Sequence, residues 1–147
     1  MLIHGGEILL KDAKPKSASD MYILNVDTLH WKRLVVMESP AGREMHILGN
    51  INNEYYVYGG MSLTDNYIMN DLWVLNCDNM DWNTQLTELH GAIWTHKQCT
   101  GNSPGPLRGH GVAAYEKYLI VFGGEDDECN PNDNMYFLDT GKKIYIH

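Results

Sequence analysis

The sequence predicts an all-β protein built from about three copies of one repeated antiparallel sheet. A Gly-Gly pair occurs three times, an apolar run ending in Leu follows each pair, and an aromatic residue stands seven positions beyond each Leu. The pairs are Gly5 and Gly6, Gly59 and Gly60, and Gly123 and Gly124, and the aromatics are Trp31, Trp82 and Tyr145. Because spacing is constant inside the predicted strands and varies between them, we expect loops on a repeated β unit.

The third copy shows four predicted strands in order, at 111–115, 118–122, 135–138 and 143–146. The second copy repeats them at 45–48, 54–58, 72–75 and 81–86, the last of which contains Trp82. The first copy has no opening strand and begins at 2–4, followed by 21–24 and 30–34. The first unit is therefore expected to be cut short.

Two of these strands are apolar or aromatic at consecutive positions, 55–58 and 118–122. A strand with one wet face should alternate, so both faces of these sheets must be covered. A four-stranded antiparallel sheet of about 45 residues stacked between copies of itself is typical of a β-propeller blade.

The residues that repeat resemble the kelch family. They are the Gly-Gly pair closing the second strand, the Asp71-Leu72-Trp73-Val74-Leu75 run in the third, the Trp in the fourth, and Pro106 to His110 leading into the first. The resemblance implies a kelch-type β-propeller fragment of about three blades, at 1–36, 43–89 and 108–147, with a long linker at 87–107. Tyr145 and Gly141 depart from the pattern, and the first copy has no Arg/His segment.

The repeated residues are expected to be structural. Glycine suits a backbone that needs positive φ or a close approach to its neighbour. The aromatics would fill the space between blades, since a ligand site would need them only once. His46 and His110 are repeat equivalents, each 13 residues before a Gly pair, and are expected to be structural too.

Eleven predicted strands do not close a ring, because propellers need at least about four blades. Either further blades lie beyond this chain, or copies associate, or the gene is truncated. Truncation is favoured over self-association, since two copies would still lack two strands.

Composition disfavours several classes of partner and cellular location. With 44% apolar residues the chain is globular, and 19 acidic against 11 basic residues give a net charge of -8, which opposes nucleic-acid binding. Cys77, Cys99 and Cys129 form an odd set without a CxxC pair, which favours a reducing, cytoplasmic location. No signal-peptide pattern or 18-residue apolar run is present, so a membrane partner is not expected.

The longest predicted loops, 7–19, 61–70 and 125–133, and the linker should share one face, because strands alternate in direction. We expect a protein partner there, bound through complementary charge or an exposed Trp94. Solvated loop charges and a Trp94 packed under its own loop are the alternatives. The candidate contacts are Lys14, Lys16, Asp65, Asn66, Tyr67, Trp94, His96, Arg108, Asp126 and Asp127.

The sequence gives little support for a catalytic site or a metal site. The acidic cluster at 126–133 lacks the order of a calcium loop, and His96 and Cys99 have no second ligand pair at zinc spacing. Neither a nucleophile elbow nor a phosphate loop is present. The sequence therefore predicts a non-catalytic scaffold without cofactor that is part of a larger protein. The alternative is a propeller enzyme, or an enzyme-associated domain, with its site near the ring axis.

Overall fold

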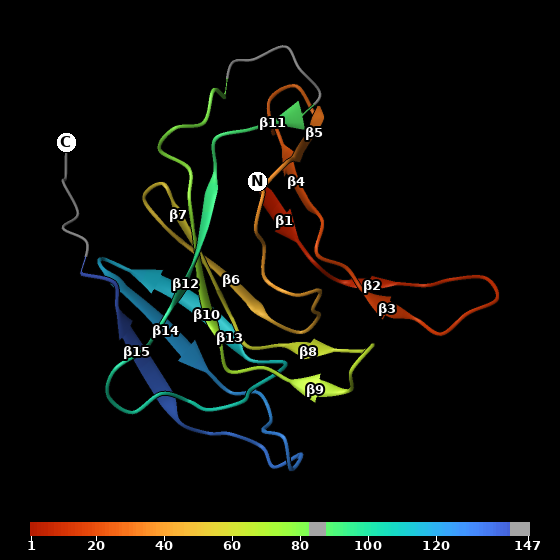
Figure 1. The fold of residues 1–147 in the computed structure, drawn as a ribbon. Helices are drawn as coiled ribbons and strands as arrows, with labels where there is room; N and C mark the ends of the chain where they lie inside the picture. The colour runs from red at the N-terminus through yellow and green to blue at the C-terminus, as the bar shows by residue number, and fades with distance from the viewer. Residues whose placement is uncertain (83–87, 142–147) are drawn as a thin grey trace.

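Three main sheets stand next to one another in chain order, antiparallel except for one short parallel pairing in the first (Figure 1). The computed structural model describes residues 1–82 and 88–141. Within those residues every regular element is a strand. The predicted all-β fold of a β-propeller fragment is confirmed.

The second sheet shows a complete four-stranded blade. Its order is β6-β7-β10-β12, with every neighbouring pair antiparallel. The strands are β6 (Ile47–Ile51), β7 (Glu54–Tyr58), β10 (Leu72–Asn76) and β12 (Ile93–Lys97). The tight turn between β6 and β7 places Asn52 at φ 55°, a left-handed conformation that asparagine tolerates better than most residues.

The third sheet repeats the first three of these strands. They are β13 (Gly111–Tyr115), β14 (Tyr118–Phe122) and β15 (Met135–Asp139), again antiparallel throughout. The strand predicted at 143–146, with Tyr145, lies outside the described residues.

The first sheet has the order β1-β4-β5-β11. The strands β1 (Leu2–His4), β4 (Met21–Leu24) and β5 (Trp31–Leu34) pair antiparallel and correspond to the second, third and fourth strands of a blade. The two-residue strand β11 (Glu88–Leu89) adds to the outer edge of β5 in parallel. In the part of the chain that the structure describes, β1 is the inner edge of this sheet.

Two of the predicted loops fold into short hairpins, which Figure 1 shows projecting to the same side. The segment after β1 forms β2 (Glu7–Ile8) and β3 (Lys16–Ser17). The segment after β7 forms β8 (Met61–Ser62) and β9 (Tyr67–Ile68). These hairpins hold the loop tips away from the sheets.

The Gly pairs have the backbone that their repetition predicts. All six glycines have positive φ. At Gly60 a Cβ would lie 2.6 Å from the carbonyl oxygen of Glu44 and 2.7 Å from the Cβ of His46. Position 60 therefore needs glycine for both its conformation and the close approach of the linker.

The fourth strand of the second blade is not the one predicted at 81–86: the strand that pairs with β10 is β12, inside the segment predicted as linker 87–107. Of the predicted strand, Asp81 and Trp82 are described and lie outside any strand, and 83–86 lie outside the described residues. The second blade thus extends beyond residue 89, and the linker to the third blade is shorter than predicted. Its first strand also begins later, at Ile47 rather than Met45.

Trp94, and not Trp82, is the repeat equivalent of Trp31. Trp31 pairs with Leu24 in β4, and Trp94 pairs with Leu75 in β10. Trp94 is 4% exposed between the blades, whereas Trp31 is 49% and Trp82 45% exposed. Trp82 therefore does not hold the predicted position in the second blade, and an insertion of 12 positions (94 − 82) explains why. The role predicted for Trp31 stays a prediction.

The core consists of two layers, one at each contact between neighbouring blades. Between the first and second blades lie Leu2, Met21, Ile23, Leu34, Val57, Leu75, Cys77, Met80, Leu89, Ala92 and Trp94. Between the second and third lie Ile47, Ile51, Tyr56, Tyr58, Leu72, Val74, Leu107, Leu119 and Val121. Each blade is thus stabilised by burial of apolar side chains against its neighbours.

The insertion before β12 joins the first two blades. Its strand β11 pairs with β5, and the amide of Val35 donates a hydrogen bond of 2.8 Å to the carbonyl of Leu89. Leu89 is fully buried in the layer between these blades. A segment of the second blade therefore completes the outer edge of the first.

Candidate protein-interaction face

One face of the stack carries the β2–β3 hairpin, the β8–β9 hairpin and the loop at 125–133. We call this surface the loop face. The hydroxyl of Ser17 accepts a hydrogen bond of 2.9 Å from the amide of Leu63, which joins the two hairpins. A guanidinium nitrogen of Arg108 lies 3.2 Å from the sulfur of Met61, and Arg108 forms an ion pair of 2.6 Å with Glu125. Segments from three blades are thus linked laterally into one surface.

The linker that enters the second blade is anchored by a buried arginine. Arg43 is 0% exposed and donates two hydrogen bonds to the carboxylate of Asp71, at 2.6 and 2.8 Å. It also donates to the carbonyl of Gly59 at 3.0 Å. Burial raises the pKa of Asp71, but the hydrogen bonds and charge of Arg43, with a hydrogen bond from Trp73, together outweigh it, so the pKa is lowered. The linker is therefore held against both the Gly pair and the start of β10.

The acidic loop is shaped by its own aspartate. Asp126 accepts hydrogen bonds from the amides of Glu128 and Asn130, at 2.9 and 2.8 Å, and these lower the pKa of its carboxyl group. The side chain thus stabilises the turn, as aspartate often does in loops. Asp127 next to it is exposed.

Most predicted contact residues lie on this face. Lys14 and Lys16 are exposed on the β2–β3 hairpin, and Asp65 and Asn66 are exposed at the tip of the β8–β9 hairpin. Tyr67 is 55% exposed in β9. The face therefore carries basic residues on one hairpin and acidic residues on the loop at 125–133.

The structure corrects one of the predicted contacts. Trp94 is buried in β12, in the layer between the first two blades, so it is unavailable to a partner, whereas the alternative prediction placed it under its own loop. Arg108 forms its ion pair with Glu125, and its role in binding stays a prediction. His96 is exposed on the outer strand β12, with its ring 5.1 Å from that of Trp73.

Sequence reasoning missed a buried pair of histidines between the first two blades. His4 Nδ1 lies 3.2 Å from His46 Nε2, so one of the two nitrogens carries the shared proton. Burial lowers the pKa of His4 to about 3 and that of His46 to about 4, and Arg43 adds repulsion in both cases. Burial also lowers the pKa of His110 to about 4. All three imidazoles are therefore neutral near pH 7.

Acid should destabilise the protein through these histidines. Their pKa values in the folded state are lower than the unfolded value of 6.5. The contribution of the neutral histidines to the free energy of unfolding is therefore complete above pH 6.5 and is lost as the pH falls towards 4. Each should reduce the free energy of unfolding by about 1.4 kcal/mol per pH unit in that window. Urea denaturation between pH 7 and pH 5 measures this slope.

A matched pair of variants tests the assignment. His4 occupies the position that Tyr58 and Phe122 hold in the other repeats, immediately before the Gly pair. His4→Phe should reduce the pH dependence by about one third, whereas His30→Gln, at an exposed position, should leave it unchanged. An unchanged slope in His4→Phe would show that His4 titrates normally.

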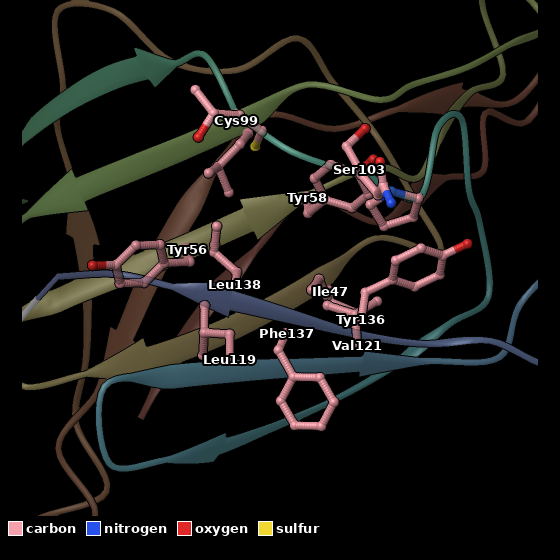
Figure 2. Close-up of a pocket in the computed structure, with 14 residues that line it drawn as sticks. Ile47, Tyr56, Tyr58, Cys99, Ser103, Leu119, Val121, Tyr136, Phe137 and Leu138 are labelled. Atoms are coloured by element: carbon pink, nitrogen blue, oxygen red, sulfur yellow. The ribbon is translucent and has the colours of Figure 1, made fainter.

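A small cavity lies between the second and third blades (Figure 2). Its volume is about 60 Å³, and Tyr56, Tyr58, Leu119 and Leu138 are among its walls. The hydroxyl of Tyr58 donates a hydrogen bond of 2.7 Å to the carbonyl of Gly105, which fixes the linker over the cavity. The space fits about two water molecules or a small apolar group.

Two general features complete the description of the site. Across residues 1–82 and 88–141, no group of three or more His, Cys, Asp or Glu side chains is placed to hold a metal ion. In the same residues, no helix has the length and apolar character needed to cross a bilayer.

The repeated blades, their Gly pairs and the loop face define a kelch-type β-propeller. A sequence profile of the KLHDC2/KLHL20/DRC7 Kelch-repeats domain matches residues 1–93, more than half of the chain. The chain belongs to this kelch-repeat family.

Similar proteins share this repeat across the chain. Kelch domain-containing protein 1 of Mus musculus is 30% identical over 95% of this chain, and Protein ral2 of Schizosaccharomyces pombe is 24% identical over 97%. Dynein regulatory complex subunit 7 of Chlamydomonas reinhardtii is 30% identical over 66%. The chain spans 29%, 26% and 8% of the lengths of these three relatives.

A solved structure agrees with the fold. The structure of YjhT superposes with a TM-score of 0.68 at 18% identity. The match covers 95% of this chain and 46% of the YjhT chain.

Proposed function

We propose that this chain is a non-catalytic interaction module that holds a protein partner on the loop face. The observation that carries the proposal is the set of contacts linking the three loop segments. Ser17 bonds to Leu63, Arg108 touches Met61, and Arg108 pairs with Glu125. Loops joined in this way lose little conformational freedom on binding, which favours affinity.

The charges on the face suggest how a partner is oriented. Lys11, Lys14 and Lys16 are exposed at the β2–β3 hairpin, and Asp127 and Asp133 are exposed in the loop at 125–133. A partner with segregated acidic and basic residues would be attracted in one orientation. Such complementarity mainly affects the association rate and specificity, and salt weakens it.

Tyr67 supplies the aromatic contact that the buried Trp94 cannot provide. It is 55% exposed in β9, on the middle of the three loop segments in chain order. A half-exposed tyrosine gives a large apolar contact and a hydroxyl group at low entropic cost, and tyrosine is enriched among residues that dominate binding energy. We expect it to lie at the centre of the contact.

The relatives support a binding role more than a catalytic one. One is named a subunit of the dynein regulatory complex, which is an assembly of proteins. The kelch repeat itself assigns architecture and not chemistry. A binding role for this chain thus rests on its own loop face.

The test is affinity capture followed by quantitative mass spectrometry. Asp127→Lys combined with Asp133→Lys should reduce recovery of a specific partner at least about tenfold, and Lys14→Glu combined with Lys16→Glu should have a similar effect. Tyr67→Ala should weaken recovery further. Raising the salt concentration should lower the recovery by the unchanged protein.

Asp27→Lys is the control, because it reverses one charge in the exposed turn before β5, on the opposite face. It should capture the same partner as the unchanged protein. Capture that is equal for all variants would exclude the loop face as the binding surface. A thermal melt of each variant separates loss of binding from loss of folding.

A further inference from the structure

Met45 is an exposed methionine in a backbone conformation that favours glycine. It lies in the linker between the first and second blades, directly before His46. Its φ is 54°, and its side chain is 56% exposed. This left-handed conformation is strained for a residue with a Cβ, and most of all for a bulky one. The linker therefore keeps a strained residue whose side chain lies largely in solvent.

The third repeat has glycine at the equivalent position. In both repeats the position lies between a residue that bridges to the one after a Gly pair and a repeated histidine. The two triplets are Glu44-Met45-His46 and Arg108-Gly109-His110. Gly109 has φ 66°, and a Cβ there would have no neighbouring atom within 4 Å among those the structure describes. The blade therefore forms without a side chain at this position.

Two other large residues with positive φ have a local reason for it. Leu29 lies in the connection between β4 and β5, and Glu116 in the connection between β13 and β14. Short connections between antiparallel strands often need positive φ. Met45 lies in a linker instead, where glycine serves the same backbone in the next repeat. Strained residues of this kind are concentrated at ligand-binding sites, so its side chain is a candidate for function.

Met45 stands where the three segments of the loop face meet. The amide of Arg43 donates a hydrogen bond of 3.0 Å to the carbonyl of Ala18, which follows the β2–β3 hairpin. The residue directly before Met45 pairs with Met61 at the start of β8. The carbonyl of Met45 accepts a hydrogen bond of 2.8 Å from the amide of Gly109, in the linker to the third blade. Met45 is thus central to the loop face.

We propose that Met45 is the apolar anchor of the loop face, and that it binds an apolar side chain in a peptide segment of the partner. This inference rests on the proposed function and adds a second uncharged contact to Tyr67. Residues that dominate the binding energy cluster near the centre of an interface. Methionine suits such a place, because its flexible and polarizable side chain adapts to the group it contacts.

The charges around Met45 define the rest of the segment. Lys14 and Lys16 are exposed on the hairpin of the first blade, and Asp127 and Asp133 are exposed on the loop of the third. An apolar centre with a charged rim is the usual arrangement of a protein interface. The segment would therefore carry acidic residues on one side of its apolar residue and basic residues on the other.

Selection of phage-displayed random peptides on the purified protein supplies a probe, and fluorescence anisotropy of a selected peptide gives its dissociation constant. The selected peptides should carry an apolar residue between acidic and basic ones. Met45→Gly should weaken binding by about 30-fold, because it removes the anchor. Met45→Leu should bind within about threefold of the unchanged protein, because leucine restores an apolar side chain of similar size.

Leu29→Gly is the matched control. Leu29 is also apolar, is 72% exposed and has φ 56°, but it lies in the connection before β5, on the opposite face. Its replacement removes a similar side chain and a similar strain, and should leave peptide binding unchanged. Both glycine variants should melt within about 3 °C of the unchanged protein, because relief of strain offsets the greater freedom of glycine in the unfolded chain.

The outcomes separate this inference from the proposed function. If Asp127→Lys with Asp133→Lys abolishes binding while Met45→Gly binds normally, the loop face binds the peptide but Met45 is not its anchor. If all these variants bind the peptide equally, the loop face is not the binding surface and both proposals fail. A melting temperature lowered by more than about 5 °C in Met45→Gly alone would assign Met45 to the fold and overturn its role as anchor. Failure to select any peptide would overturn the peptide segment as the ligand.

Discussion

Replacing Arg43 by alanine is expected to lower the free energy of unfolding by about 3–5 kcal/mol, because it leaves the carboxylate of Asp71 without its buried partner. Arg43 is 0% exposed and donates two of the hydrogen bonds to that carboxylate, which also accepts one of 2.7 Å from the indole nitrogen of Trp73. It also satisfies the carbonyl of Gly59. Urea denaturation at pH 7 measures the loss.

Two further variants isolate the ion pair. Arg33→Ala removes an exposed arginine that pairs with Asp20 and Glu88, and should cost less than about 1 kcal/mol. In the third repeat, Leu107 and Asn134 hold the positions of Arg43 and Asp71, so Arg43→Leu with Asp71→Asn should recover most of the stability. A loss in Arg43→Ala no larger than in Arg33→Ala would show that the buried pair contributes little.

Gly60→Val is expected to unfold the protein or to lower its free energy of unfolding by more than about 4 kcal/mol. Gly60 has φ 90°, and a Cβ there would lie 2.6 Å from the Glu44 carbonyl oxygen. Valine would meet both the strained backbone and the clash. A thermal melt followed by circular dichroism gives the result.

Gly6→Val provides the matched control. Gly6 has φ 104°, but a Cβ there has no neighbouring atom within 4 Å among those the structure describes. Its replacement should cost only the conformational strain, about 1–3 kcal/mol. If Gly60→Val melted at the temperature of the unchanged protein, the close approach of the linker would not be essential.

The repeat made the fold predictable wherever spacing is constant. The Gly pairs and the runs at 72–75 and 118–122 lie where their repetition predicts, because each recurs at the same place in a blade. The fourth strand of the second blade was mispredicted, since Trp82 satisfies the seven-residue spacing while an insertion carries Trp94 to the paired position. Spacing alone cannot tell which of two tryptophans pairs with Leu75.

The candidate site was less predictable, because side-chain contacts depend on three dimensions. Sequence position indicated the exposure of Lys14, Lys16 and Tyr67. It gave no signal that Asp126 folds its own loop, and it left open whether Trp94 is exposed or packed. Arg43 was also missed, although an arginine three residues before His46 in a mostly apolar linker was the available signal.

The strand β11 couples local unfolding of the first sheet to that of the second. It joins Leu89 to Leu34, which are distant in sequence, and places both in one buried layer. The first sheet therefore has no outer edge strand that frays independently of the second, and amides in these two sheets should share one cooperative opening. Because such a distant pairing costs loop-closure entropy before it forms, it belongs to a late stage of folding.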